Sequence, residues 1–273
     1  MADAGAGVEK TLSASDIHER WEDVYRTKEN AAFYDLVYDR IVEELDAPVG
    51  SAILDGGCGP AAHSIGLAQR GFDVVAADFS EVILKLAAET VDAAGMSSRI
   101  SLQREDLTRL SFTDGAFRYV FCWGVLMHIP DVKMAVSELC RVVAPGGSLV
   151  ISEGNMHSAQ TRLLRLARRL FGGETGEIKV TDAGLERWQQ TLDGPILARN
   201  ANIGWIINVC AEEGLTLKKK MPGQFSEAYA KIPRGMKRLS AFVHAVNRFW
   251  FKYIGWAGPS FGNVLIFEKT TQP

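Results

Sequence analysis

The stretch that decides the fold is ILDGGCGPAAHS, residues 53–64. It begins as a short buried strand, ends that strand on the carboxylate of Asp55, and turns through Gly57 and Gly59 into a helix. Glycines at such a turn allow positive φ and a close approach of the backbone to a ligand. Pro60 suits the first helical position, where its missing N–H costs nothing, so we expect the helix to begin there. The open end of that helix would offer N–H groups to a ligand.

Charge decides between two ligands for this turn. The segment also matches the dinucleotide fingerprint G-x-G-x-x-G/A, with Asp78 at the distance expected for a ribose contact. A nicotinamide-dependent oxidoreductase is therefore an alternative. Asp55 argues against it, because it places negative charge at the strand tip and no lysine or arginine between Ser51 and Gln69 neutralises a diphosphate. A ligand that carries positive charge fits this turn better.

Asp55, Gly57 and Gly59 together resemble the first motif of the class I S-adenosylmethionine (SAM)-dependent methyltransferases. SAM carries an ammonium and a sulfonium, so this resemblance agrees with the charge argument and implies SAM as the cofactor. The sequence departs from the family at Ala61, where a third glycine is common. Because alanine is also small, we expect only a modest effect on the turn.

The second and third motifs of that family follow in order. The resemblance assigns Asp78, at the end of one apolar run, to the ribose hydroxyls, and Phe79 beside it is in position to pack on the adenine. It assigns Asp106 to the adenine edge, with Leu107 supplying a backbone or apolar contact. The strands that carry these residues are the runs 72–78 and 100–107.

The fourth motif, residues 119–131, ends an apolar strand at Trp123, assigned to the cofactor site, and places His128 just beyond it. Residues 139–151 resemble the helix, turn and strand that come next in the family. The resemblance covers residues 51–154 and implies an α/β fold with a doubly wound, Rossmann-like, mostly parallel seven-stranded sheet. It is closest to the branch that methylates small molecules such as quinones and natural products.

Composition agrees with a single large domain. The 273 residues are 47% hydrophobic with a mean hydropathy near zero, enough to bury a sizeable core. A net charge of −3 gives no electrostatic reason to expect nucleic acid as a partner. The four cysteines show no paired spacing, and neither a signal core nor a run of about 18 apolar residues is present. We therefore expect reduced thiols and a cytoplasmic protein.

The chain divides into parts by its patterns. We expect one methyltransferase domain over residues 1–273, consisting of N-terminal lid helices (1–45), the SAM-binding core (51–154) and two helical cap insertions (155–199 and 226–262). The cap insertions would leave the sheet at the carboxyl ends of strands, where open α/β sheets bind ligands. Substrate choice should therefore reside in them.

The N-terminal part begins with an Ala/Gly-rich stretch, residues 1–13, which we expect to be disordered. A first lid helix is predicted from about Ser15, and a second from 31 to 45. In similar enzymes a tyrosine of such a helix reaches the SAM carboxylate, and the resemblance transfers this role to Tyr25. Packing of Tyr25 beside Trp21 is the alternative.

The cap insertions hold or adjoin Trp188, Trp205, Trp250 and Trp256. We expect these rings to form the core of the cap in preference to contacting substrate. Either way the enclosed space would be apolar, which favours a small hydrophobic acceptor, lipid-like or aromatic.

One cap segment, residues 161–171, reads TRLLRLARRLF and has arginines on one side of a helix and leucines on the other. Such a helix can lie on an anionic membrane surface. We favour a cap helix with its arginines in water and its leucines over the active site. Aromatic and basic residues also mix at 248–256, as they do at membrane interfaces, so weak peripheral membrane contact stays open.

Methyl transfer from a sulfonium needs mainly alignment of the acceptor, exclusion of water and removal of a proton. His128 is the candidate general base for transfer to oxygen, with a packing role as the alternative. Glu153 and His157 are reserves, and their spacing with His128 matches no metal motif, so no metal is expected. His63 is expected to face solvent. A catalytically silent SAM-binding subunit remains the alternative outside enzymes.

Overall fold

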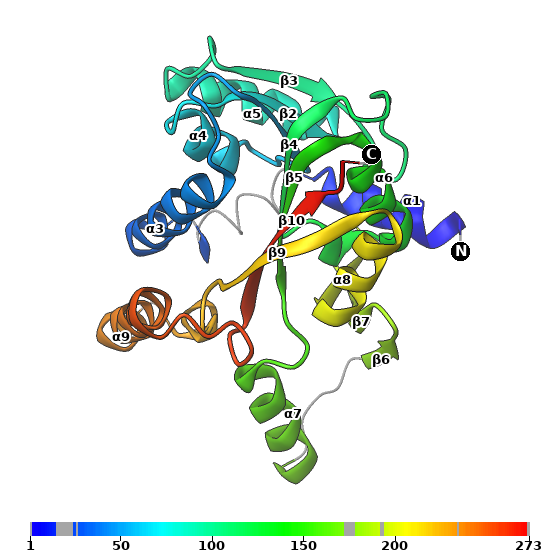
Figure 1. Cartoon of the computed structure of the whole chain (residues 1–273). Helices are drawn as coiled ribbons and strands as arrows, with labels where there is room; N and C mark the ends of the chain where they lie inside the picture. The colour runs from blue at the N-terminus through cyan, green and yellow to red at the C-terminus, as the bar shows by residue number, and fades with distance from the viewer. Residues whose placement is uncertain are drawn as a thin grey trace.

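The computed structural model describes residues 2–14, 24–25, 27–171, 178–191, 194–233 and 235–271. Its centre is a seven-stranded sheet in the order β3-β2-β1-β4-β5-β10-β9 (Figure 1). In the described part of this sheet β10 runs opposite to the other six strands, which confirms the predicted doubly wound, mostly parallel α/β fold. The strands are β1 (Ala52–Gly56), β2 (Asp73–Asp78), β3 (Ile100–Arg104), β4 (Phe117–Trp123), β5 (Val143–Gly154), β9 (Leu215–Pro222) and β10 (Gly262–Lys269).

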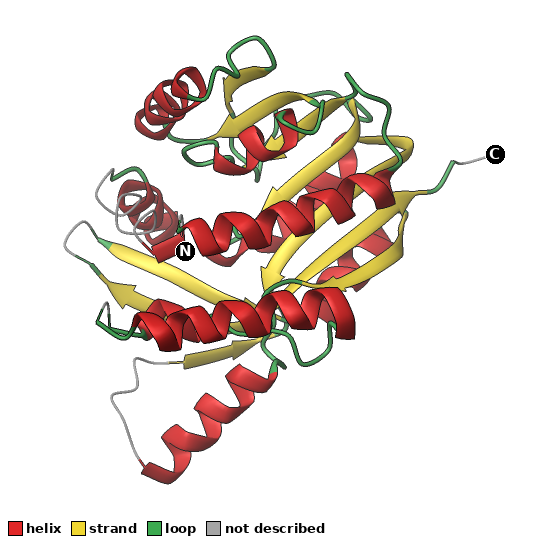
Figure 2. Cartoon of the chain, turned by 90° about the vertical axis from the view of Figure 1, so that its left-hand side faces the viewer, coloured by secondary structure: helices red, strands yellow, loops and turns green. Residues whose placement is uncertain are grey.

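Helices cover both faces of this sheet (Figures 1 and 2). Successive side chains of a strand point to opposite faces, so Ile53 and Leu54 of β1 enter two different cores. The core around Ile53 is closed by α3, α4 and α5, and the core around Leu54 by α6 and α8. These helices are α3 (Lys28–Leu45), α4 (Ala62–Ala68), α5 (Glu81–Ala93), α6 (Val132–Val142) and α8 (Ile203–Glu212).

The N-terminus is helical, so the expectation of disorder over residues 1–13 is wrong. Helix α1 (Ala2–Leu12) packs on the cap, with Val8 and Thr11 buried. Gly7 lies so close to Pro195 that a Cβ would come within 2.9 Å of the proline ring. The Ala-rich composition that resembles a flexible tail also has high helix propensity, and tertiary contacts then hold the helix in place.

The two predicted lid helices fare differently. The first lies outside the described residues except for Val24 and Tyr25, which are helical. The second is α3, which begins at Lys28, three residues earlier than predicted, because the Thr27 hydroxyl caps it by accepting the Asn30 N–H at 3.3 Å.

The glycine turn after β1 is longer than predicted. Helix α4 begins at Ala62, so the expectation that Pro60 occupies its first position is wrong. Ala61 precedes the helix with φ of 66°, in the left-handed region that glycine tolerates best. This places a strained alanine at the position where the family often has its third glycine.

The first cap insertion is only half helical, which corrects the prediction of purely helical caps. It consists of α7 (Ala159–Phe171), which projects from the body of the molecule (Figures 1 and 2), followed by a three-stranded antiparallel sheet. We call this the cap sheet; its strands are β6 (Ile178–Thr181), β7 (Gly184–Gln190) and β8 (Pro195–Ala201). Burial along β8 does not alternate simply, so the two-residue period that predicts strands is obscured.

The second cap insertion is helical, as predicted. It contains the short turn η2 (Ala228–Lys231), then α9 (Lys237–Phe249), which continues directly into one π-helical turn, η3 (Trp250–Ile254). No described helix has the length and apolar composition needed to cross a bilayer.

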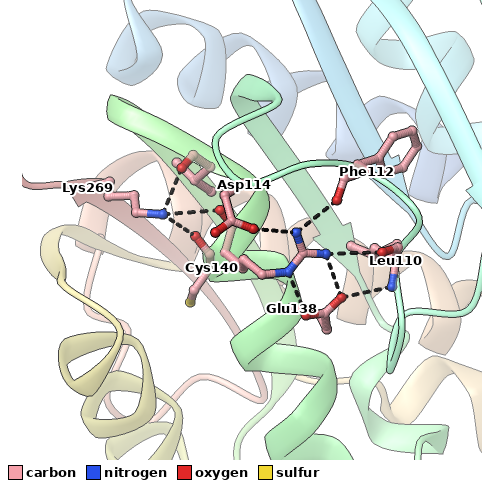
Figure 3. Close-up of polar contacts among 8 residues, drawn as sticks. Leu110, Phe112, Asp114, Glu138, Cys140 and Lys269 are labelled. Atoms are coloured by element: carbon pink, nitrogen blue, oxygen red, sulfur yellow. Dashed lines mark hydrogen bonds and ion pairs between the residues drawn. The ribbon is translucent and has the colours of Figure 1, made fainter.

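A network around Arg141 of α6 anchors the loop between β3 and β4 (Figure 3). The guanidinium donates to the carbonyls of Leu110 and Phe112 and pairs with Asp114 and Glu138. Glu138 in turn accepts the Leu110 N–H at 2.9 Å, and the Arg141 contact lowers the pKa of Glu138. This loop carries Asp106 and Leu107, so the network fixes one wall of the candidate site.

Candidate active site

A cavity of about 1200 Å³ opens where β1, β2, β3 and β4 end. This is the point at which strand order reverses, between β1 and β4, and open α/β sheets bind ligands there. One wall comes from the loops after these strands, and the other from α1, α3 and the cap sheet. The volume exceeds the range of about 300–1000 Å³ typical of a single small-molecule site, so a cofactor and an acceptor can share it.

The glycine turn forms the floor of the cofactor side. Gly57 has φ of 79°, and a Cβ there would lie 2.5 Å from the methyl groups of Val125. Gly59 has φ of 53°, and a Cβ there would meet no atom within 4 Å, so its backbone borders open space. The turn thus needs glycine at one position for packing and leaves the other open to a ligand.

Asp78 borders the cavity, whereas Asp55 lies behind its wall. Asp78 accepts N–H bonds from Gly59 (3.1 Å) and Ser80 (3.0 Å), which fixes its carboxylate beside the turn. Asp55 is 1% exposed, and its carboxylate accepts the hydroxyl of Ser64 at 2.5 Å. Burial raises the pKa of Asp55 to about 7, and the charge of Asp78 adds to this rise. Asp55 does not border the cavity, and its direct contact with the cofactor stays a prediction.

The cavity lining is acidic overall. Seven carboxylates border it, against one lysine and one arginine, Lys179 and Arg199. Arg199 is itself paired with Glu186 at 2.9 Å. The carboxylates belong to Glu9, Asp35, Asp78, Glu105, Asp106, Asp131 and Glu186. Such a lining favours a cationic ligand over a diphosphate, as the sequence predicted from the glycine turn.

Aromatic rings surround His63 on the cofactor side. Its ring stacks on Trp123, with centroids 5.1 Å apart, and its Nδ1 lies 2.6 Å from the hydroxyl of Tyr38. Tyr34 packs edge-on against both His63 and Trp123. All four residues border the cavity, so the expectation that His63 faces solvent is wrong. Sequence reasoning missed this cluster because the tyrosines come from α3, 25 or more residues before His63.

The remaining predicted cofactor residues also border the cavity. Phe79 follows β2, Asp106 and Leu107 follow β3, and Tyr25 lies on the side of the second cap insertion, edge-on to Tyr229. Burial raises the pKa of Tyr25 well above its usual value, so it is a neutral hydroxyl. The Asp106 carboxylate accepts both the N–H and the hydroxyl of Thr108. Their individual contacts with the cofactor stay predictions.

His128 borders the cavity from η1 (Leu126–His128), just after β4. Its Nδ1 lies 2.6 Å from the carbonyl oxygen of Leu197 in β8. Because a carbonyl only accepts, Nδ1 carries the hydrogen, and in the neutral ring Nε2 holds the lone pair. The cap sheet thus selects the tautomer of the predicted base.

Arg199 of β8 holds the loop that carries His128. Its guanidinium is 2% exposed and donates to the carbonyls of Leu126 (2.8 Å) and Ile129 (2.9 Å), on both sides of His128. Glu186 of β7 accepts two further bonds from it. Sequence reasoning missed this clamp, because nothing in the local pattern distinguishes a buried arginine on β8 from an exposed one.

The two reserve bases do not border the cavity. Glu153 is 3% exposed, and its Oε1 accepts the Leu126 N–H at 2.8 Å, so it supports η1 from below. Burial raises its pKa to about 8. His157 is exposed on the surface. Among the described residues no three potential metal ligands come together.

The four cap tryptophans have separate positions. Trp188 borders the cavity, and Trp205 packs against the core beneath the sheet. Trp250 bonds through its Nε1 to the carbonyl of Trp256, whose own ring is exposed. The predicted common cap core is therefore wrong. The leucines of α7 are also exposed and none borders the cavity, so that helix does not cover the active site.

Comparison with known proteins agrees with this geometry. A family model described as a methyltransferase domain matches residues 53–147. Methyltransferase GfsG of Streptomyces halstedii is 29% identical over 68% of this chain and 72% of its own length. A ubiquinone biosynthesis O-methyltransferase of Alkalilimnicola ehrlichii is 32% identical over 56% of this chain and 59% of its own. The chain spans about half the length of the demethylmenaquinone methyltransferases that it also matches.

The fold has solved counterparts. The magnesium protoporphyrin IX methyltransferase of Synechocystis was solved with bound S-adenosylhomocysteine (SAH). It superposes with a TM-score of 0.63 and 17% identity, over 96% of this chain and 99% of that one. Residues 53–147 are therefore a methyltransferase domain, and the chain is similar in sequence to SAM-dependent methyltransferases. Its cofactor is SAM, which suits the open glycine turn and the acidic lining of the cavity.

Proposed function

We propose that this methyltransferase transfers the methyl group of SAM to an oxygen atom of a small, largely apolar acceptor. The observation that carries the proposal is the meeting, in one cavity, of the cofactor turn with His128 and an apolar patch of the far wall. That patch includes Val8 and Leu12 of α1 and Trp188 of the cap sheet, and the charged side chains of Glu9 and Lys179 border the cavity on the same wall. The name of the Alkalilimnicola ehrlichii relative, an O-methyltransferase of ubiquinone biosynthesis, supports oxygen as the methylated atom.

SAM supplies an electrophilic methyl group on its sulfonium sulfur. His128 would take the hydroxyl proton of the acceptor at Nε2, because the Leu197 carbonyl holds the hydrogen on Nδ1. Arg199 would keep the His128 loop in register with the cap sheet, and the apolar patch would orient the acceptor and exclude water. The reaction would leave a methyl ether and S-adenosylhomocysteine, with the proton on His128.

The test compares two substitutions of His128. Asparagine can donate its side-chain N–H to the Leu197 carbonyl, as Nδ1 does, but has no basic atom; alanine loses both. We expect His128→Asn and His128→Ala to lower kcat by about 100-fold or more, with the calorimetric affinity for SAH unchanged. Catechols and hydroquinones are the acceptors to begin with. An Asn variant as active as the wild type would show that His128 only packs.

The same experiment addresses the silent-subunit alternative. SAH binding without methylation of any hydroxylated apolar acceptor would favour a silent subunit. Methylation at nitrogen or carbon, identified by mass spectrometry of the product, would overturn the assignment to oxygen and leave the methyltransferase class intact.

A further inference from the structure

Helix α9 buries polar side chains and exposes several large apolar ones. Its buried residues are polar, His244 and Asn247, and Asn247 bonds to both backbone groups of Ser226. Val243 and Val246 are half-buried, and the other large apolar residues are on the outside. A stripe at helical spacing runs along α9 and η3, and its side chains are 47–66% exposed; it consists of Leu239, Phe242, Phe249 and Tyr253. A helix in a globular protein normally buries its apolar face. The exposed apolar stripe of α9 and η3 is therefore not covered by any of the described residues.

Helix α7 has a second exposed stripe. Leu163, Leu166 and Leu170 recur on one helix face and are each more than half exposed. Arg162, Arg165 and Arg169 recur at the same spacing one residue earlier, and all three are exposed. The basic stripe therefore lies beside the apolar one, the arrangement of helices that lie in a membrane interface.

The start of α7 is bonded to the segments on either side of α9 and η3. Gln160, at the start of α7, accepts bonds from the Ser226 hydroxyl (2.7 Å) and the Glu227 N–H (2.9 Å). The Ala159 N–H donates to the carbonyl of Pro259 at 2.9 Å. Both insertions leave the sheet where β5 and β9 end, the same edge as the cavity. Figure 1 shows α9 at the lower left and α7 at the bottom of the molecule.

Positive charge is concentrated in the two segments that contain α7, α9 and η3. Residues 155–173 and 228–267 contain 10 of the 30 lysines and arginines of the chain and none of its 33 acidic residues. The chain as a whole has a net charge of −3. A surface of this kind attracts an anionic partner, and each basic residue near an anionic bilayer adds roughly tenfold or less to the binding constant.

We propose that the exposed faces of α7 and α9–η3 form a docking surface for an anionic lipid bilayer. Leucine and phenylalanine side chains would enter the acyl boundary, Tyr253 and Trp256 would lie at the headgroups, and the basic residues would meet lipid phosphates. A second copy of the chain is disfavoured as occupant, because two such surfaces would bring like charges together. The inference stands on exposure and charge and does not depend on the proposed acceptor.

The test is co-flotation of the full chain with vesicles of phosphatidylcholine containing phosphatidylglycerol, and with vesicles of phosphatidylcholine alone. We expect binding to the anionic vesicles, at least tenfold weaker binding to the neutral ones, and loss of binding at high salt. Phe242→Glu with Phe249→Glu should weaken anionic binding at least tenfold. Arg162→Gln with Arg165→Gln and Arg169→Gln should do the same while leaving the apolar stripes in place.

A matched control places two glutamates on exposed apolar positions elsewhere. Val49→Glu with Met134→Glu adds the same charge outside the docking surface and should leave vesicle binding unchanged. Calorimetric SAH affinity and thermal unfolding verify that each variant is folded, and they report the cofactor site separately. Equal binding to both vesicle types, no binding at all, or binding unaffected by Phe242→Glu with Phe249→Glu would overturn the proposal. So would light scattering that shows a dimer which these glutamates dissociate.

Discussion

The cofactor half of the cavity is made mainly by one continuous stretch of chain, joined by two tyrosines of α3, whereas the acceptor half is assembled from distant segments. Residues 57–131 supply the cofactor turn, Asp78, the Asp106 loop and Trp123, each at or just after the end of a strand of the main sheet. The far wall comes from α1 and the cap sheet, about 190 positions apart in sequence. The first half depends on local backbone geometry, and the second depends on a few long-range contacts.

Removing the Arg199 guanidinium should have the largest effect, and it should impair the acceptor half of the cavity while the cofactor half still binds SAH. Arg199→Met leaves Glu186 nearly buried without its partner and removes the donors to the Leu126 and Ile129 carbonyls. We expect a loss of about 3–5 kcal/mol in the free energy of unfolding, measured in urea. Activity should fall while SAH affinity is retained in the folded protein.

Because Arg199 is paired with Glu186, a second substitution should restore part of the stability that Arg199→Met loses. Adding Glu186→Gln to Arg199→Met removes the unpaired charge, so the double variant should be more stable than the single one. A single variant that unfolds like the wild type would show that the clamp adds little to stability.

The converse variant acts on the cofactor half. Gly57→Ala combines a positive φ of 79° with a Cβ only 2.5 Å from Val125, so the turn must shift. We expect SAH affinity to fall by about 30-fold or more, which corresponds to about 2 kcal/mol or more of strain and overpacking. Gly95→Ala is the control, since its φ of 68° gives the same backbone strain with no atom within 4 Å. Equal SAH affinities for the two variants would contradict the packing argument.

Glu153 supports η1, which carries His128, and its buried carboxyl makes the stability of the protein depend on pH. Its pKa is raised by burial to about 8, so the folded state binds the proton more tightly than the unfolded chain. The stability that this proton contributes is full below about pH 4.5 and is lost as pH rises through 8. Glu153→Gln keeps an acceptor for the Leu126 N–H but has no charge. Between pH 5 and pH 9 the wild type should lose about 4 kcal/mol relative to this variant in urea unfolding. Parallel pH profiles for the two proteins would mean that Glu153 is ionised without penalty.

The smallest effect is expected at Ala61. Its φ of 66° strains an alanine, so Ala61→Gly should stabilise the protein by about 0.5–1 kcal/mol. Ala62→Gly, one position later in α4, should instead destabilise it by about as much, because glycine loses more entropy in a helix. Thermal unfolding of the pair measures both, and a shift of the same sign in both variants would argue against strain at Ala61.

Prediction from sequence succeeded where chemistry follows local pattern. The run from Ile53 to Gly59 predicted a strand, a glycine turn and a cationic ligand, because backbone conformation at glycine and charge at a strand tip are properties of adjacent residues. The doubly wound, mostly parallel seven-stranded sheet followed from the family resemblance and is confirmed. Asp78, Asp106 and Trp123 all border the cavity for the same reason: each lies at or just after the carboxyl end of a strand.

It failed where a residue's role depends on distant partners. His63 is placed by Tyr38 and Trp123, the N-terminal helix by contacts with the cap, and Arg199 by carbonyls of a loop 70 positions earlier. The basic amphipathic pattern of α7 was visible in sequence, yet only the exposure of its leucines shows that it does not cover the active site.

The sequence by itself determined the class of fold, the cofactor turn and the sign of charge at the site, since these follow from residue type and near-neighbour spacing. The tertiary structure alone decided which groups close the acceptor side, which tautomer His128 adopts and which apolar faces stay exposed. These depend on how segments far apart in the chain pack, and packing is a property of the whole folded molecule.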